Sequence, residues 1–355
     1  MVVLRHGFSI FFFEALVVEP HSKMEPGKGW LGLDIGGANL KAATKAGWAE
    51  EIPFPLWKHP EELAGQLKSL RMLVPHLDRI AVTMTGELCD CFQSKREGVL
   101  HIVDAVETAF QGATICYWSN QGDWVGADIA KVFPYRLAAS NWLALCQFLA
   151  EMLVGEPTVL VDMGSTTTDI LYLVPGNVLC QGRDDPSRLK SGELVYTGLT
   201  RSPICSLVQD GFCAEVFSTT LDAHLVMGTL EENPSRFDSA DGRAWTREMA
   251  HGRVARMLGA DLETSTKAER EALATAVIST QWARIARGIQ AVLERNGNAN
   301  CFILGGQGAD WIGQRLLMTG KANEKAILYL REIWGEKGAR VACARAVSLL
   351  AEAHE

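Results

Sequence analysis

Two copies of a short acidic turn, one in each half of the chain, constrain the fold more than any other feature. In "GLDIGGANLK" (32–41) an apolar run leads into Asp34 and then Gly36. In "LVDMGSTTTDI" (160–170), about 128 residues later, a similar run leads into Asp162 and then Gly164. Strand-forming residues follow both turns, so the chain should return as an antiparallel strand rather than enter a helix. Each half therefore opens with a hairpin, which predicts α/β architecture with mixed sheets.

Hydrophobic periodicity predicts the other elements of this architecture. The segments around 39–47 and 48–57 extend the first hairpin into a meander of three strands. We expect the middle, 183–265, to be irregular with helical fragments. Further buried strands are predicted at 79–86, 113–119, 157–165, 300–308 and 326–330, and helices at 59–73, 98–110, 140–153, 267–297 and 344–353.

The length of the chain favours two domains. It has 355 residues, 48% of them hydrophobic, which is more than a single core usually holds. Residues 1–28 read as an N-terminal extension, predicted to be disordered, with Met24 as an alternative start. We predict a first domain at 29–154 and a second at 155–355, with the boundary at "VGEP".

Charge and cysteine usage exclude several functional classes. The formal net charge is −8 and the chain lacks a dense Lys/Arg run, so we expect no nucleic-acid partner. No stretch approaches 18 uncharged apolar residues, so we expect a cytoplasmic protein without a membrane partner. The nine cysteines include no C-x-x-C pair and predict reduced thiols. His101, His224 and His251 lack metal-ligand spacing and are expected to be structural. The oligomeric state is left open.

The composition of the turns points to phosphate chemistry. Glycines let the backbone approach a ligand closely and aim N–H groups at phosphate oxygens. A carboxylate repels phosphate but can hold a divalent cation that binds it, usually through water for Mg²⁺. We therefore predict Asp34 and Asp162 as metal residues and Lys41 as a point charge for phosphate. The predicted phosphate-binding residues of the turns are Gly36, Gly37, Asn39, Gly164, Ser165, Thr166 and Thr167.

A single turn of this kind would be read as an ordinary tight hairpin. The second copy and a third glycine segment, "ILGGQG" (303–308), argue against that reading. A Rossmann dinucleotide site is also excluded, because that fingerprint requires the glycines to lead into a helix.

Together the three segments resemble the actin-like ATPase superfamily of sugar kinases, heat-shock chaperones and actin. Asp34, Gly36, Gly37 and Lys41 match the first phosphate turn of that superfamily, and the residues from Asp162 to Thr167 match the second. Gly305, Gly306 and Gln307 match its nucleoside-facing segment. The resemblance implies a two-domain, ribonuclease H-like fold with mixed sheets and a site in the cleft between the domains.

Four further motifs narrow the resemblance: "MTGELCDCFQSKREGV" (84–99), "SNWLA" (140–144), "VDMGSTTTDI" (161–170) and "YTGLTRSPIC" (196–205). With them the chain, from about residue 29 onward, is similar to the hydantoinase/oxoprolinase-related proteins of tetrahydromethanopterin-linked one-carbon pathways, which include the condensing enzymes of methanofuran biosynthesis. That similarity implies a Mg²⁺-dependent transferase that joins a furan-methyl diphosphate to an amine or phenol acceptor such as γ-glutamyltyramine, releasing pyrophosphate.

The expected small-molecule site also draws on residues outside the turns. Glu87 is a candidate catalytic residue, for which the family resemblance implies a substrate or metal role. The reaction also calls for a base, because an attacking phenol must lose its proton. The candidates for substrate binding are Asp90, Asn141, Thr197 and Arg201. A charged, solvated loop is the alternative reading for Glu87 and Asp90, a polar residue of the first helical turn for Asn141, and a surface charge for Arg201.

Two other functions stay open at this point. One is an ATP-dependent small-molecule kinase or ATPase, for which ATP would be the cofactor beside Mg²⁺. The other is a non-catalytic actin-like binding protein. A nucleotide enzyme needs room for adenine near Gly305 to Gln307, and we expect ATP to be disfavoured if Gln307 and Trp311 fill that space.

Overall fold

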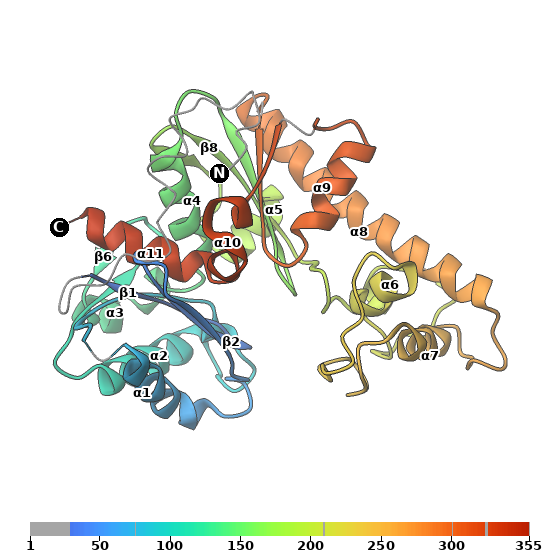
Figure 1. Cartoon of the computed structure of the whole chain (residues 1–355), viewed down its shortest axis with the longest axis horizontal. Helices are drawn as coiled ribbons and strands as arrows, with labels where there is room; N and C mark the ends of the chain where they lie inside the picture. Colours follow the sequence, from blue (N-terminus) through green and yellow to red (C-terminus); the bar gives the residue numbers. More distant parts are fainter. Residues whose placement is uncertain (1–28, 75, 209, 300, 324–325, 355) are drawn as a thin grey trace. The chain divides into compact units, whose positions relative to one another are not determined.

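The computed structural model describes residues 29–74, 76–208, 210–299, 301–323 and 326–354 (Figure 1). The predictions for the N-terminal extension, 1–28, lie outside the described residues. The chain is a mixed α/β protein with two mixed sheets, as the sequence predicts.

Contacts divide the chain into two compact units. The first contains the described residues up to Thr158, residues 172–187 and the described residues from Leu328 onward. The second contains residues 159–171 and 188–327. The proposed domain division at 154/155 stays a prediction. In the structure the last helix groups with the first unit, although the sequence places it in the second domain.

The first sheet has the strand order β3-β2-β1-β4-β5-β6. β1 pairs with β2 antiparallel, β2 with β3 antiparallel, and β1 with β4 parallel, so the predicted meander is present. The strands are β1 (Leu31–Ile35), β2 (Asn39–Thr44), β3 (Ala49–Pro53), β4 (Arg79–Met84), β5 (Thr114–Trp118) and β6 (Trp124–Val125).

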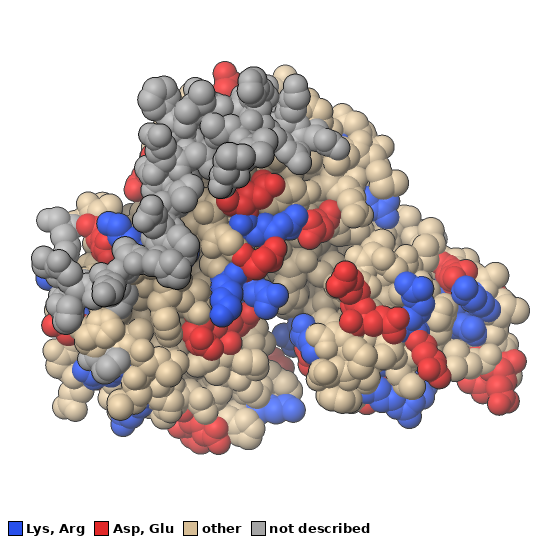
Figure 2. Space-filling view, viewed as in Figure 1, with Lys and Arg blue, Asp and Glu red and all other residues tan. Residues whose placement is uncertain are grey.

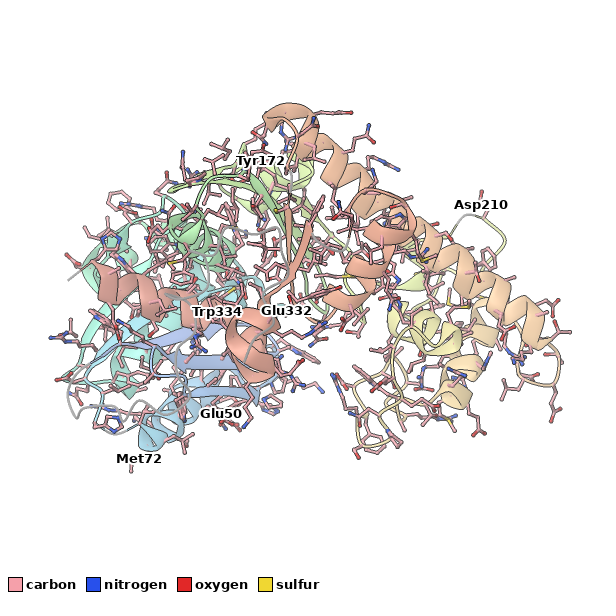
Figure 3. All side chains as sticks on the ribbon, turned by 45° about the horizontal axis from the view of Figure 1, so that its top comes forward. Glu50, Met72, Tyr172, Asp210, Glu332 and Trp334 are labelled. Carbon is pink, nitrogen blue, oxygen red and sulfur yellow. The ribbon has the colours of Figure 1, made fainter. Side chains whose placement is uncertain are left out.

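Helices cover both faces of this sheet (Figure 1). α1 (Leu63–Leu73) and α2 (Lys95–Ala109) pack on each other, and α1 buries Leu63, Leu67 and Leu70. This unit also contains η2 (Pro60–Glu62), η3 (Gly86–Leu88), α3 (Ala127–Val132), η4 (Pro134–Arg136), α4 (Asn141–Met152) and α10 (Leu330–Arg340). Trp334 of α10, labelled in Figure 3, packs on Phe148 of α4 with ring centroids 5.6 Å apart.

The last helix, α11 (Ala342–Ala353), lies directly on β1. A Cβ at Gly32 would clash with the carbonyl oxygen of Ala344, so only glycine allows the helix to come this close. The Ser348 hydroxyl also donates to the Trp30 carbonyl at 2.7 Å. This close packing explains why α11 belongs to the first unit.

The second sheet has the order β10-β8-β7-β11-β12, with β9 also paired to β8. Its strands are β7 (Thr158–Met163), β8 (Thr168–Val174), β9 (Asn177–Leu179), β10 (Leu194–Val195), β11 (Cys301–Gly305) and β12 (Ile327–Tyr329). α8 (Lys267–Asn296) begins with a capping box between Thr266 and Glu269, and Gly297 ends it as predicted. α9 (Ala309–Met318) follows β11.

The segment predicted to be irregular contains α5 (Asp185–Ser191), η5 (Ile204–Ser206), α6 (Thr220–Met227) and α7 (Arg247–Met257). α6 packs against both α7 and α8. Arg253 and Asp222 form a fully buried ion pair between α7 and α6, with Nε and Oδ1 2.7 Å apart. This pair ties the two short helices together.

The surface carries charges of both signs. Figure 2 shows acidic and basic side chains interspersed on the face in view. Met72, labelled in Figure 3, is among the exposed apolar side chains. Within the described part of the chain, no helix is long and apolar enough to cross a membrane, and no disulfide joins two of the cysteines.

Candidate active site

The first acidic turn joins β1 to β2 and is closed by one hydrogen bond. The Gly36 N–H donates to the Asn39 carbonyl at 3.1 Å. The carbonyls of Gly37 and Ala38 accept from Leu56 and Phe54, both at 2.9 Å. The N–H groups of Gly37 and Ala38 make no hydrogen bond to any described residue. Two consecutive N–H groups left unused in this way are available to bind an anion.

The second turn, between β7 and β8, repeats this geometry. The Gly164 N–H donates to the Thr167 carbonyl at 2.9 Å. The Ser165 carbonyl accepts from Thr200 and Arg201, and no described residue accepts from the N–H groups of Ser165 and Thr166. The two sequence copies are therefore two copies of one backbone structure, each leaving two amides for a ligand.

Asp34 is buried at the end of β1, with 4% of its surface exposed. Burial raises the pKa of this carboxyl, against the lowering effects of the Lys41 charge and of a hydrogen bond from Asn141. Its Oδ1 is buried and makes no hydrogen bond in the described part of the chain. A buried carboxylate oxygen without a partner is costly unless a cation or donor completes it, so Asp34 fits the predicted metal role.

Lys41 lies directly opposite Asp34 in the β1–β2 ladder and opposite Glu51 in the β2–β3 ladder. Side chains opposite each other in an antiparallel pair approach closely enough to interact. Lys41 therefore compensates the buried charge of Asp34, a role that the sequence reading did not include.

Glu87 lies in η3, immediately after β4, and is 1% exposed. Burial raises its pKa to about 7, partly offset by hydrogen bonds to its carboxylate from its own N–H and from Ala139 and by the charge of Lys95. Oε2 has no partner in the described part of the chain. The reading of Glu87 as a solvated loop charge is wrong, because α2 covers it: a Cβ at Gly98 would collide with the Glu87 backbone.

Residues at the start of α4 and just before it hydrogen-bond to both carboxylates. Ala139 bonds Glu87, and Asn141, in the first turn of α4, bonds Asp34. Ala139 has φ of +48°, a left-handed conformation that is unusual for a residue other than glycine. Ser140 does not cap α4 with its side chain; its hydroxyl instead bonds Thr83 and the Trp118 carbonyl, both at 3.0 Å. No sequence signal marks Ala139 as part of the site.

Asp90 is exposed in the loop after η3. The same loop reaches the first turn through Cys89, because a Cβ at Gly37 would lie 2.7 Å from the Cys89 sulfur. Lys95 of α2 forms an ion pair with Asp185 at 3.4 Å. Substrate binding by Asp90 stays a prediction.

The third glycine segment contacts Asp162. Gly306 has φ of +74°, and a Cβ there would lie 2.5 Å from Oδ1 of Asp162. The segment leads from β11 into α9, and the Gly308 N–H donates to the Met163 carbonyl at 2.9 Å. Gln307 and Gly306 are exposed, Gly305 is buried, and Trp311 is 3% exposed. Trp311 therefore fills interior space while Gln307 does not, so the predicted condition against ATP is met only in part.

Thr197 and Arg201 belong to one loop that braces the second turn. Thr197 is fully buried and its carbonyl accepts from the Thr168 hydroxyl at 2.8 Å. Arg201 is exposed, and its N–H donates to the Ser165 carbonyl at 2.9 Å. The burial of Thr197 favours a supporting role over direct contact with substrate.

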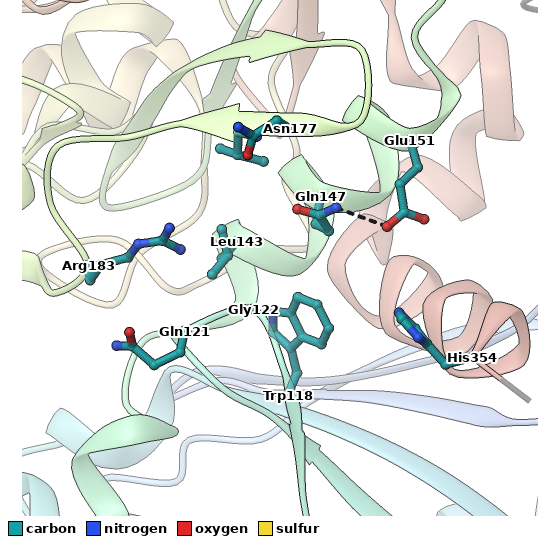
Figure 4. A pocket seen from close by; sticks show the side chains of 10 residues that line it. Trp118, Gln121, Gly122, Leu143, Gln147, Glu151, Asn177, Arg183 and His354 are labelled. Carbon is teal, nitrogen blue, oxygen red and sulfur yellow. Dashed lines mark hydrogen bonds between the residues drawn. The ribbon is translucent and has the colours of Figure 1, made fainter.

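One cavity of about 240 Å³ lies in the first unit and includes none of the predicted site residues (Figure 4). Its lining residues are Trp118, Gln121, Gly122, Leu143, Gln147, Glu151, Asn177, Val178, Arg183 and His354.

Within the described residues, the one cluster of three potential metal ligands is His59, Glu61 and Glu62, all exposed. This cluster contains neither Asp34 nor Asp162.

Comparison with known proteins identifies the family. The chain is 32% identical over 317 residues to the (4-{4-[2-(γ-L-glutamylamino)ethyl]phenoxymethyl}furan-2-yl)methanamine synthase of Methanocaldococcus jannaschii, covering 86% of this chain and 92% of the synthase. The chain belongs to this synthase family. A synthase of the same name from Methanococcus vannielii is 28% identical over 205 residues, covering 56% of this chain and 91% of its own. The hydantoinase/oxoprolinase family model matches residues 78–200.

Among solved structures, the nucleotide-free acetone carboxylase is similar with a TM-score of 0.51 and 10% sequence identity. The match covers 90% of this chain and 70% of that chain. Together with the two mixed sheets, this similarity confirms the predicted fold class of this chain, α/β with mixed sheets. At this identity it carries no information on substrate.

Proposed function

We propose that the protein joins a furan-methyl diphosphate to the phenol of a γ-glutamyltyramine-like acceptor and releases pyrophosphate, as a step in methanofuran-type cofactor biosynthesis. The observation that carries this proposal is the relationship to the M. jannaschii synthase across 92% of its length. That enzyme is named for a product containing a phenoxymethyl–furan ether. The relatives' names favour neither a kinase nor a non-catalytic protein.

The proposed reaction breaks the bond between the furan-methyl carbon and the diphosphate oxygen. Both bonding electrons leave with the diphosphate, and the positive charge on carbon delocalises into the furan ring. The phenol oxygen then forms the new C–O bond to this carbon and loses its proton. Atoms and charge balance, with the ether, pyrophosphate and one proton as products.

We assign the unused backbone amides of the two turns to the diphosphate. Gly37 and Ala38 offer them in the first turn, and Ser165 and Thr166 in the second. Fixed N–H donors that meet the charge developing on a leaving group lower the barrier to its departure. Hydroxyls of Ser165 to Thr167 add further donors, and Lys41 adds positive charge beside the first turn.

Asp34 and Asp162 are the residues we propose for holding Mg²⁺. The unpartnered, buried Oδ1 of Asp34 supports this assignment. When bound, the ion would neutralise diphosphate charge. Lys41 and Asn141 keep the Asp34 carboxylate in place beside the first turn.

Glu87 is our candidate for accepting the phenol proton. Its pKa of about 7 leaves a substantial carboxylate fraction at neutral pH while keeping it basic enough to take a proton. The N–H of Ala139 holds one part of the carboxylate and leaves Oε2 for the transfer. Because Glu87 is buried, the transfer would proceed through a bound water or after a local rearrangement.

The test is product formation. Protein and Mg²⁺ are incubated either with aminomethylfuran diphosphate and γ-glutamyltyramine or with ATP, and pyrophosphate, phosphate, ADP and the coupled ether are measured. We expect pyrophosphate and ether in equal amounts in the first mixture. ADP or phosphate from the second mixture, with no ether from the first, would overturn the proposal.

A further inference from the structure

A buried polar relay in the second unit reaches the second turn from the interior. It begins at His224 of α6 and passes through Gln281 of α8, both 0% exposed. It ends at Thr197 and Gly198, in the loop that contacts Ser165. Polar side chains this deeply buried are costly to maintain unless every group is paired.

The Gln281 amide is fully paired. Its Nε2 donates to the Gly198 carbonyl at 2.7 Å and to the Thr197 hydroxyl at 3.1 Å. Its Oε1 lies 3.0 Å from His224 Nε2. The Gly198 carbonyl can only accept, which fixes the orientation of the amide, and Oε1 must then accept a hydrogen bond from the Nε2–H of His224.

The orientation of Gln281 fixes the tautomer of His224. With its proton on Nε2, neutral His224 accepts at Nδ1 from the Thr229 hydroxyl at 2.7 Å. Burial lowers the pKa of His224 to about 4, so the ring stays neutral at physiological pH. Trp311 of α9 packs edge-on against this ring at 5.2 Å, so the relay also contacts the helix that follows the third glycine segment.

The loop that contains Thr197 and Gly198 is hydrogen-bonded to the second turn. Leu199 donates to the Gly164 carbonyl, and Thr200 and Arg201 donate to the Ser165 carbonyl. A Cβ at Gly198 would clash with the backbone of Ser165 and Thr166, so the loop and turn are in direct contact. The carbonyls of the turn are thereby held inward, and the amides of Ser165 and Thr166 are left for the ligand.

From this chain of contacts we infer that Gln281, oriented by His224, is a positioning residue for the second phosphate turn. It sets where the turn's amides point without touching the ligand. Thr220 donates to the same Gly198 carbonyl at 2.9 Å, but the contacts to Thr197 and His224 belong to Gln281. Only the expected change in KM rests on the proposed function; the structural role of Gln281 does not.

The test compares two variants with a matched control. Gln281→Met keeps the length of the side chain and removes all three hydrogen bonds. Gln281→Glu keeps the shape and the acceptor and removes the donors, which preserves the test if the first variant fails to fold. Val277→Ala, one turn earlier on α8 and equally buried, removes apolar packing from the same helix and leaves the relay's hydrogen-bonding groups unchanged.

Hydrogen exchange at the amides of Leu199, Thr200 and Arg201 is the first measurement. We expect exchange about fivefold faster or more in both Gln281 variants and unchanged in Val277→Ala. Equal acceleration in the control, or none in the variants, would overturn the inference.

Kinetics provide the second measurement. The KM for the furan diphosphate should rise about threefold or more in the Gln281 variants, with the KM for the phenol unchanged. Equal increases in both KM values would contradict a role at the phosphate turn. If the wild-type protein lacks transferase activity, the proposed function fails, and the exchange experiment still decides the role of Gln281.

Discussion

At the scale of single residues, burial sets the chemistry of Asp34 and Glu87. Both carboxyls have raised pKa values, and each has one buried oxygen without a partner in the described part of the chain. Such groups reduce stability unless a ligand completes them, and they are common where a protein binds or transforms a substrate.

Replacing Asp34 separates activity from stability. Asp34→Asn keeps the shape and removes the charge proposed to hold Mg²⁺, so turnover should fall about 100-fold or more while the fold persists. Asp162→Asn should act in the same way. Pyrophosphate release and circular dichroism are the measurements. Asp104→Asn, an exposed carboxylate of α2 paired with Lys131, is the control and should keep full activity. Normal turnover in both site variants would refute the metal role.

Glu87 should make stability depend on pH. Its pKa is about 7 in the folded protein against 4.5 unperturbed, so folding favours the protonated form. Its contribution is complete below pH 4.5 and is lost as the pH rises through 7. Glu87→Gln lacks this loss, so the variant should gain up to about 3 kcal/mol relative to wild type between pH 4.5 and 8. Urea unfolding at several pH values measures this difference. Parallel stability curves would contradict a buried Glu87.

The sequence predicts these residues unequally. Asp34 and Gly36 can be recognised because an apolar strand, an acidic glycine turn and a second strand follow one another directly in the sequence. Ala139 cannot, because alanine has no intrinsic preference for the left-handed backbone conformation that it adopts here. The hydrogen bonds of the buried Ser140 hydroxyl cannot be predicted either, because a serine at the start of a helix suggests a helix cap.

At the scale of elements, the loop 196–201 and the second turn are in close contact. Gly198→Ala would force a methyl group into the Ser165–Thr166 backbone, so we expect a loss of about 1–3 kcal/mol together with weaker diphosphate binding. Gly65→Ala in α1 meets no atom within 4 Å and should stabilise by about 0.5–1 kcal/mol. Thermal unfolding and KM measure both. Similar changes in the two variants would argue against the contact.

The pairing of α6 with α7 depends on a buried charge. Arg253→Met would leave the Asp222 carboxylate buried without its partner and should cost about 3–5 kcal/mol. The control is Lys267→Met, which removes an exposed ion pair with Glu271 and should cost less than about 1 kcal/mol. Denaturant unfolding compares them, and equal losses would show that the buried pair is not needed.

Elements defined by local signals are predictable, and those defined by distant packing are not. α8 can be read from its Thr266–Glu269 capping box, its periodicity and Gly297. The helix α11 is equally readable, but its place on β1 is not, because the glycine that admits it lies more than 300 residues earlier in the chain. The helices α6 and α7 are short, and their polar buried faces mask the hydrophobic period.

At the scale of the whole molecule, the chain contains the same hairpin twice, with different charged side chains beside the two turns. Two residues after the turn closes, the first copy has Lys41 and the second has Asp169, which pairs with the buried Arg188 at 2.6 Å. The copies therefore share backbone geometry and differ in charge. Sequence reveals the repeat, and the family relationship supports the diphosphate-binding role that we propose for it, since the fold alone serves enzymes with unrelated substrates.

The central claim is that diphosphate leaves from the furan-methyl carbon and that the phenol oxygen takes its place. The most direct measurement uses γ-glutamyltyramine labelled with ¹⁸O in the phenol hydroxyl, with mass spectrometry of both products. We predict that the label is fully retained in the ether and that the pyrophosphate is unlabelled. Label in pyrophosphate, or an unlabelled ether, would contradict the account.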